Sequence, residues 1–299
     1  MLKKRAIKRI ITSTGALFIF LLIYIFPKQE KYSIPEEVIY VNELTMPLYT
    51  LDQNSYVART NIIKKNEDDI NYIINVLTKN SINSNYLAAN FTPVIPENTK
   101  LLDYSLNDNI LKLNFSKELL NVSEKDEEKM IESLIYSLCE IKDVNKIMIF
   151  VEGKELNELP NSKIKLPTVL DKSFGVNKVY DVNNIKGIVK TTVYYMKKYE
   201  DDLYYVPITK ITNSDKKCIE IIIDELKSSP TYESNLLSFL TASYELENYE
   251  ILDNTISLTF NNKLLANLND EEITEKVKYS LALSIRDSLN IEDIVININ

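Results

Sequence analysis

The chain has 299 residues, enough for about two domains of ordinary size, and its 45% apolar and 26% charged residues are typical of a folded protein. Five of its 35 lysine and arginine residues lie among the first nine residues, so the remaining 290 carry 30 basic against 43 acidic residues, a net charge of −13 that disfavours binding to nucleic acid. The absence of histidine removes the commonest general base and metal ligand, which argues against catalytic triads and zinc hydrolases.

An uncharged apolar segment follows the basic N-terminus. Residues 10–27 carry no charge, and 18 residues in a helix span about 27 Å, close to the hydrocarbon thickness of a bilayer. Because the positive charges precede this segment, residues 1–27 are predicted to form a cytoplasmic tail and a single transmembrane anchor, with the body extracytoplasmic. No pair of small residues suited to signal peptidase follows, so we expect an uncleaved anchor and then a tether over residues 28–36.

The body contains an internal repeat. Residues 108–115 match residues 253–260, and the Leu-Leu pair that follows each segment matches at the same offset of 145. Upstream, residues 73–77 correspond to 222–226, and small changes of offset are what loop insertions produce. We therefore predict an α+β fold made of two tandem copies of a mixed sheet-plus-two-helix domain, at residues 37–155 and 190–299.

Each copy is predicted to begin with strands and a helix. Aromatic and β-branched residues indicate the opening strands, at Ile39, Val41 and Tyr56 and at Val193, Tyr195 and Tyr205. Apolar residues then recur with helical spacing, at Ile70, Ile73, Ile74 and Leu77 and at Ile219, Ile222, Ile223 and Leu226. Burying four such side chains contributes about 6–12 kcal/mol, so we expect these helices to exist because they pack on a sheet.

A hairpin, a second helix and a closing strand complete each copy. Strands are predicted at residues 101–106 and 110–115, with Asp108 in the turn, and the second copy turns at Asp253. The second helix is predicted at residues 127–141, and its counterpart carries Ile273, Val277, Leu281 and Ile285. Closing strands are predicted at residues 146–151 and 293–298.

Residues 156–189, which carry several Pro and Gly, are predicted to link the copies, with one strand near residues 185–190. Cys139 and Cys218 lie 79 residues apart and start no metal or redox motif. Cys139 falls in a helical apolar pattern, which favours a small buried thiol, and a disulfide between the two stays open.

Ordered motifs in the first copy resemble a known family. They are the P-x-x-T-x-L-L pattern at residues 96–102, a strand end at 113–116, the Ile-Tyr-Ser-Leu run at 135–138 and Val-Glu-Gly-Lys at 151–154. Together they resemble the GerMN domain, and the tandem arrangement behind one anchor resembles the GerM-type sporulation and spore germination family. Asn98 stands where the family usually has Gly, and the second copy lacks P-x-x-T. The resemblance implies a non-catalytic, extracytoplasmic module, similar in topology to ring-building domains and associated with envelope assemblies between mother cell and forespore.

Several residue pairs and single residues admit a second interpretation. Acidic pairs could act as a glycosidase acid and base, although solvated helix faces are the commoner explanation; the pairs are Glu127–Glu128, Glu271–Glu272 and Asp201–Asp202. The paired tyrosines could form a glycan or protein platform, although half-buried strand positions are commoner; they are Tyr194–Tyr195 and Tyr204–Tyr205. Ser116 and Asn261 could be ligands, but residues directly after a strand more often bond local backbone.

The sequence thus predicts a membrane-anchored, non-enzymatic scaffold or assembly factor of the sporulation and germination envelope. No catalytic, metal-binding or cofactor-binding residue is predicted. The expected partners are envelope proteins of the sporulating cell, with the membrane held through residues 10–27, and the oligomeric state stays open. The alternative is a peptidoglycan-binding or cell-wall hydrolytic module.

Overall fold

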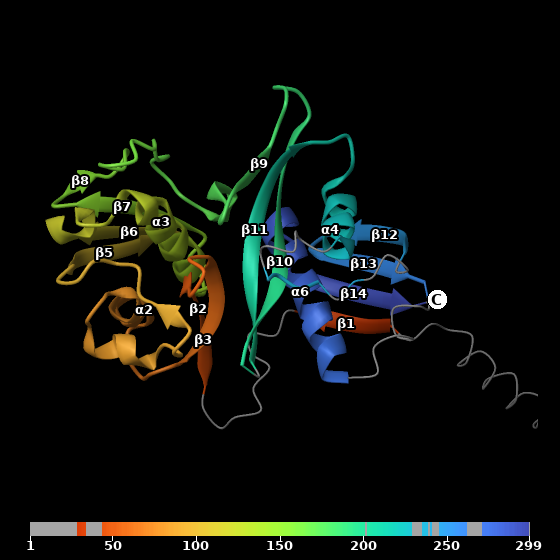
Figure 1. Cartoon of the computed structure of the whole chain (residues 1–299), viewed down its shortest axis with the longest axis horizontal. Coiled ribbons are helices and arrows are strands. Elements are labelled where there is room, and N and C mark those ends of the chain that lie inside the picture. Colours follow the sequence, from red (N-terminus) through yellow and green to blue (C-terminus); the bar gives the residue numbers. More distant parts are fainter. Residues whose placement is uncertain are drawn as a thin grey trace, which may run out of the picture.

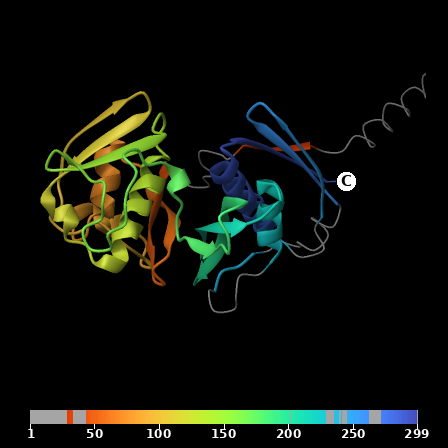
Figure 2. The same ribbon diagram turned by 90° about the horizontal axis from the view of Figure 1, so that it is seen from above.

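The structure is a computed structural model that describes residues 29–33, 44–200, 202–228, 235–238, 240, 245–261 and 271–298. The expected tail and transmembrane anchor lie outside these residues, as do Ile39 and Val41, so those assignments stay predictions. Within the described ranges, no helix is both long and apolar enough to cross a membrane. Two α+β halves lie side by side and meet where β3 and β11 run next to each other (Figures 1 and 2).

The first copy has the predicted order of opening strands, helix, hairpin, second helix and closing strand. Its main elements are β2 (Thr45–Asp52), β3 (Val57–Ile63), α2 (Asp69–Leu77), β4 (Phe91–Thr92), β5 (Leu101–Asn107), β6 (Ile110–Phe115), α3 (Glu124–Leu138), β7 (Lys146–Val151) and β8 (Lys154–Glu155). Single 3-10 turns lie at η1 (Ile82–Tyr86), η2 (Lys117–Leu120) and η3 (Lys172–Phe174).

The second copy repeats this order. Its elements are β9 (Val179–Asp181), β10 (Ile188–Tyr199), β11 (Asp202–Asn213), α4 (Cys218–Lys227), β12 (Leu246–Leu252), β13 (Thr255–Phe260), α6 (Glu271–Leu289) and β14 (Asp293–Ile298). One further strand, β1 (Gln29–Ser33), comes from the N-terminal side of the chain. The predicted α+β fold with two tandem copies is confirmed, and the second helix of the first copy begins three residues earlier than expected.

Strand registers show that the hairpins of the two copies are equivalent. Antiparallel β5 and β6 pair from Leu101 with Phe115, and β12 and β13 pair in the same way at an offset of 145. Both hairpins are irregular at the same place, after Leu101 and after Leu246. Both turns begin with an aspartate at positive φ, 50° at Asp108 and 54° at Asp253, which this residue type tolerates. The repeat therefore extends to the level of single backbone irregularities.

The first helix of each copy packs by the predicted face. The four spaced apolar residues of α2 are between 0% and 7% exposed, and those of α4 are equally covered. The Asp68 side chain caps α2 by accepting the N–H groups of Ile70 and Asn71. In the hairpin that follows, Leu111, Leu113 and Phe115 are fully buried, while the alternate residues face outward. The apolar face of α2 and the buried face of the hairpin thus belong to one core.

The described strands form three sheets. Two small sheets have the orders β5-β6-β7-β8 and β12-β13-β14-β1, and β6–β7 and β13–β14 are parallel. The third sheet has the order β10-β11-β3-β2-β4, with β9 added in parallel to β11. Its antiparallel contact between β3 and β11, centred on Arg59 and Tyr205, joins the opening hairpins of both copies into one sheet.

Much of the predicted linker, residues 156–189, is packed structure. Leu159, Leu166, Leu170 and Val176 belong to the core of the first copy, and Leu170 pairs with Ile147 through two backbone hydrogen bonds. β9 then joins the shared sheet, and the strand expected near residues 185–190 begins at Ile188. These residues connect the copies while they complete the core of the first.

The predicted tether also contains structure, because β1 pairs with β14. The pairing is antiparallel and runs from Gln29 opposite Asn297 to Ser33 opposite Asp293. In the first copy the corresponding edge, that of β7, is covered by β8, which follows β7 directly in sequence. A segment from the other end of the chain therefore fills the same position in the second copy.

Candidate functional site

At the joint between the two copies, residues contact their own counterparts. The phenol oxygens of Tyr49 (β2) and Tyr194 (β10) lie 2.9 Å apart, and these residues are 145 positions apart. Asp52 and Lys197 are also 145 positions apart, and 2.7 Å separates the Lys197 Nζ from an Asp52 carboxylate oxygen. Contact between equivalent residues is the property of a two-fold, isologous interface. The joint is thus an approximately two-fold interface within one chain.

Serine side chains on the long helices hold both strands of the joint in the same way. Ser137 of α3 accepts the Tyr49 N–H at 2.9 Å and donates to the Tyr49 carbonyl at 3.2 Å. In the second copy, Ser284 of α6 accepts the Tyr194 N–H at 2.8 Å, and Ser280 donates to the Tyr194 carbonyl. The α3–β2 and α6–β10 contacts therefore orient the two tyrosines toward each other.

The Asp52 carboxylate is the centre of the first buried charge cluster. Besides Lys197, it accepts the Tyr204 hydroxyl at 2.9 Å and the backbone N–H groups of Asn54 and Tyr56 at 2.8 and 2.9 Å. The side chains of Asp52 and Lys197 are 0% and 5% exposed. Burial, and then the neighbouring Asp52 charge, raise the pKa of the Tyr204 hydroxyl, which stays a neutral donor. Every oxygen of this carboxylate is therefore satisfied inside the protein.

A second cluster lies between α3, α6 and the η3 turn. Arg286 donates to both carboxylate oxygens of Glu140, and its Nη1 lies 3.1 Å from Glu140 Oε2. Lys172 donates to both Glu140 and Asp287, and its Nζ lies 3.0 Å from Asp287 Oδ1. Tyr194 also donates to Asp287. Burial alone would raise the pKa of the Glu140 carboxyl, but the Arg286 and Lys172 charges outweigh it and hold that pKa well below its usual range. The pKa of Asp287 is lowered by the same two cations.

These clusters can orient the two copies, because their carboxylates are buried and paired with cations of the joint. The Asp52 and Asp287 side chains are at most 1% exposed, and each carboxylate is paired within the joint. Buried ion pairs add little net stability, but a buried charge that loses its partner is costly. Any orientation of the copies that separated these pairs would therefore be disfavoured. The joint therefore fixes the relative orientation of the copies.

Sequence reasoning missed the joint, although a signal was present. Asp52 and Lys197 carry opposite charges at equivalent positions of the repeat. Opposite charges at equivalent positions are complementary when two copies meet about a two-fold axis. Comparing charges across the repeat, rather than apolar positions alone, would have found this pair.

Of the acidic pairs considered as catalytic groups, Glu127–Glu128 makes structural contacts. Glu127 is fully buried, which corrects the expected solvated face, and its carboxylate accepts the backbone N–H groups of Asn161 and Ser162 at 2.9 and 2.7 Å. Burial would raise the pKa of Glu127, but these hydrogen bonds lower it. Glu128 pairs with Lys178 at 2.8 Å. The pair at 271–272 opens α6 as expected, and of the third pair only residue 202 is described.

The tyrosine pairs form no exposed platform. Tyr194 and Tyr195 are at most 1% exposed, more deeply buried than the half-buried strand positions expected, and Tyr204 contacts Asp52. Ser116 accepts the Lys100 N–H at 3.0 Å, so it bonds backbone as expected, but the partner lies 16 residues earlier and not in the local chain. The Asn261 N–H donates to the Glu245 carbonyl at 3.1 Å.

Both cysteines are free thiols. Cys139 ends α3 and its Sγ lies 3.5 Å from the Asn145 carbonyl, while the Cys218 Sγ lies 3.6 Å from the Thr191 hydroxyl. Burial raises the pKa of the Cys139 thiol to about 12. In the described part of the chain, no three Cys, Asp or Glu residues are grouped to hold a metal ion.

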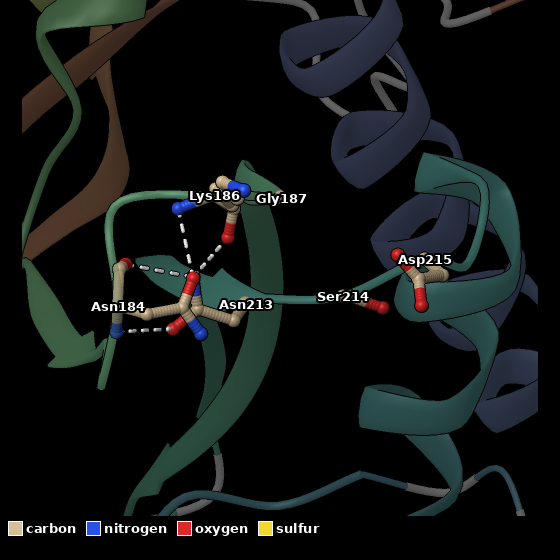
Figure 3. Close-up of a pocket in the computed structure, with 6 residues that line it drawn as sticks. All are labelled: Asn184, Lys186, Gly187, Asn213, Ser214 and Asp215. Carbon is tan, nitrogen blue, oxygen red and sulfur yellow. Dashed lines mark hydrogen bonds between the residues drawn. The ribbon is translucent and has the colours of Figure 1, made fainter.

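A shallow depression of about 330 Å³ lies where the loop before β10 meets the end of β11 (Figure 3). Its centre is the Asn213 side chain, whose Oδ1 accepts the Asn183 N–H at 2.8 Å and whose Nδ2 donates to the Lys186 carbonyl at 2.6 Å. Gly187 adopts a φ of 63°, which favours glycine. Asn184, Asn213 and the Lys186 backbone bond one another, so this depression is built on a hydrogen-bonded turn.

Comparisons with known proteins agree with this architecture. The family model described as "Germane: Sporulation and spore germination" matches residues 47–157. The spore germination protein GerM of Bacillus subtilis is 28% identical over 258 residues, which cover 84% of this chain and 70% of that protein. A solved structure of the tandem GerMN domains of the sporulation protein GerM from the same organism superposes with a TM-score of 0.78 and 25% identity, covering 86% of this chain and 92% of the other. Over most of its length the chain is therefore similar to GerM-type proteins with tandem GerMN domains, and its residues 47–157 match the family model.

Proposed function

We propose that this chain is a non-enzymatic scaffold or assembly factor of the sporulation and germination envelope machinery, anchored in the membrane and acting outside the cytoplasm. It works by holding envelope proteins in a fixed arrangement. The observation that carries the proposal is the joint, whose buried ion pairs and hydrogen bonds hold the two equivalent domains together as one body. Such a body presents two related surfaces at a constant orientation, which is what a scaffold requires.

Two further observations support this role. The similar Bacillus subtilis protein is named a spore germination protein, and the solved structure is titled as that of a sporulation protein. The acidic residues closest to a hydrolase pattern, Glu127 and Glu128, are engaged in holding a loop and a lysine. Function has to be argued from a site, and these residues serve the fold.

The proposal is tested in sporulating cells that carry a tagged chain. Mild cross-linking and purification should recover envelope proteins, and cells that lack the chain should be impaired in sporulation or germination. Recovery of no envelope protein, together with normal sporulation and germination of the null strain, would contradict the role.

A separate assay distinguishes the scaffold from a cell-wall module. The purified protein is incubated with peptidoglycan sacculi, and both the pellet and the released soluble fragments are measured. The scaffold role predicts neither co-sedimentation nor release. Released fragments, absent when the protein is boiled first, would favour the hydrolytic alternative.

A further inference from the structure

The outer edge of β12 combines features that suit the docking of another strand. β12 is the terminal strand of its sheet, and within the described ranges no strand pairs with its outer side (Figure 1). Ile251 and Leu252 are 48% and 70% exposed. An edge strand with free backbone groups and exposed apolar residues is a template for strand addition.

The hairpin geometry determines which backbone groups face outward. Leu252 and Thr255 flank a two-residue turn, and the residues that flank such a turn exchange hydrogen bonds. Pairs alternate along an antiparallel ladder, so Glu250 also bonds β13 while Ile251 and Tyr249 direct their N–H and C=O groups away from it. Two residues of β12 therefore offer backbone donors and acceptors to an added strand.

Charge distinguishes this edge from its equivalent in the first copy. Residues 245–253 contain four acidic side chains and no lysine or arginine, whereas the equivalent residues 100–108 contain two acidic residues and one lysine. Lys217, at the start of α4, lies 5.4 Å from the Tyr249 ring, on the side that faces the helices. The edge of β12 is thus the more acidic of two otherwise equivalent edges.

Charge complementarity selects the occupant. Two β12 edges from separate chains would bring four carboxylates against four, which disfavours pairing with a second copy. Tyr249 and Ile251 lie opposite the buried Leu258 and Ile256 and so share their sheet face, whereas the exposed Glu250 projects from the other face. An added strand would place apolar residues beside the first two and a basic residue beside Glu250.

We propose that the edge of β12 is a docking site for an extended segment of a partner protein in which apolar and basic residues alternate. This inference rests on the proposed scaffold function and specifies one of its contacts. The first copy presents an equivalent edge of different charge, so the two ends of the scaffold would hold different partners.

Binding is measured with the full chain, purified in mild detergent, and seven-residue peptides matched to the length of β12. One peptide alternates lysine and valine, and the other alternates glutamate and valine. We expect the lysine peptide to bind about tenfold more tightly or better, and to weaken as salt is added. Equal binding of both peptides, or no binding of the lysine peptide, would overturn the proposal. The acidic residues of 245–253 would then serve only to disfavour pairing between the β12 edges of two chains.

The repeat supplies matched variants. Ile251→Pro removes an outward N–H and should abolish binding of the lysine peptide, while Leu106→Pro, the same change 145 positions earlier, should leave it unchanged. Glu250→Lys should weaken binding about tenfold, and Ser105→Lys at the equivalent position should not. Loss of binding in both members of a pair would contradict a site on β12.

The outcome in cells is separable from the test of the proposed function. If Glu250→Lys captures the same envelope proteins as the wild-type chain, the docking site is wrong while the scaffold role stands. If the variant loses one partner and keeps the others, the docking site is supported.

Discussion

Replacing Asp52 by Asn tests whether the buried ion pair holds the joint. At 2.7 Å from Lys197, and with an effective dielectric constant of about 20, the attraction is about 6 kcal/mol before the cost of burial is subtracted. Asn keeps the size of the side chain but strands a lysine that is 5% exposed. Breaking such a pair from one side costs about 3–5 kcal/mol, and we expect this decrease in the free energy of unfolding.

Unfolding in urea, which does not screen charge, measures this free energy for the purified protein. Asp224→Asn is the matched control, because the Lys216–Asp224 pair is 2.6 Å long but more than half exposed on the lysine side, so the expected loss is about 0–1 kcal/mol. Adding Lys197→Met to Asp52→Asn removes the stranded charge, and the combined loss should fall short of the sum by about 1–3 kcal/mol. A loss below about 1 kcal/mol for Asp52→Asn, or strictly additive losses, would refute the reasoning.

Three further predictions concern other parts of the chain. Gly175→Ala should destabilise the protein more than Gly153→Ala. Both glycines have positive φ, which costs alanine about 1–2 kcal/mol, but only at Gly175 would an added Cβ lie 2.9 Å from a side chain, that of Thr209. Equal losses of stability in thermal unfolding would contradict this packing. Cys139 is half-buried, and its pKa is raised to about 12, so at pH 8 it should react with a thiol reagent more slowly in the native protein than after unfolding. Equal labelling rates would contradict this raised pKa. The free energy of unfolding should fall as the pH drops below about 4, because the ionised Glu140 stabilises the folded state and protonation removes that contribution. In urea titrations the free energy of unfolding of Glu140→Gln should depend less on acid pH. An unchanged dependence would exclude this carboxyl as a cause.

The elements with local signals could be predicted from the sequence. The spacing of Ile70, Ile73, Ile74 and Leu77 gave a helix that packs by those residues, and the turns at Asp108 and Asp253 lie in equivalent hairpins. Periodicity and turn chemistry are properties of neighbouring residues, so one sequence contains them. The duplication supported the predicted order of elements, because the same pattern occurs in both copies.

The pairing of strands that lie far apart in the sequence could not be predicted from such local patterns. The contact of β3 with β11 and of β1 with β14 depends on which edges meet in space, and no local pattern encodes that choice. Glu127 was expected in solvent because acidic residues usually are, but the 156–176 segment folds over it and supplies N–H donors. The charges of the candidate site also come from segments far apart in the sequence, and the opposite charges of Asp52 and Lys197 at equivalent repeat positions were the one signal for it.

The central claim is that the two copies form one rigid body through a two-fold joint. Residual dipolar couplings of the weakly aligned protein test it directly, when they are fitted separately for residues 44–176 and 188–298. The account predicts that both sets fit a single alignment tensor in the relative orientation of Figure 1. Two tensors of different magnitude, or one tensor that requires a different orientation, would contradict it.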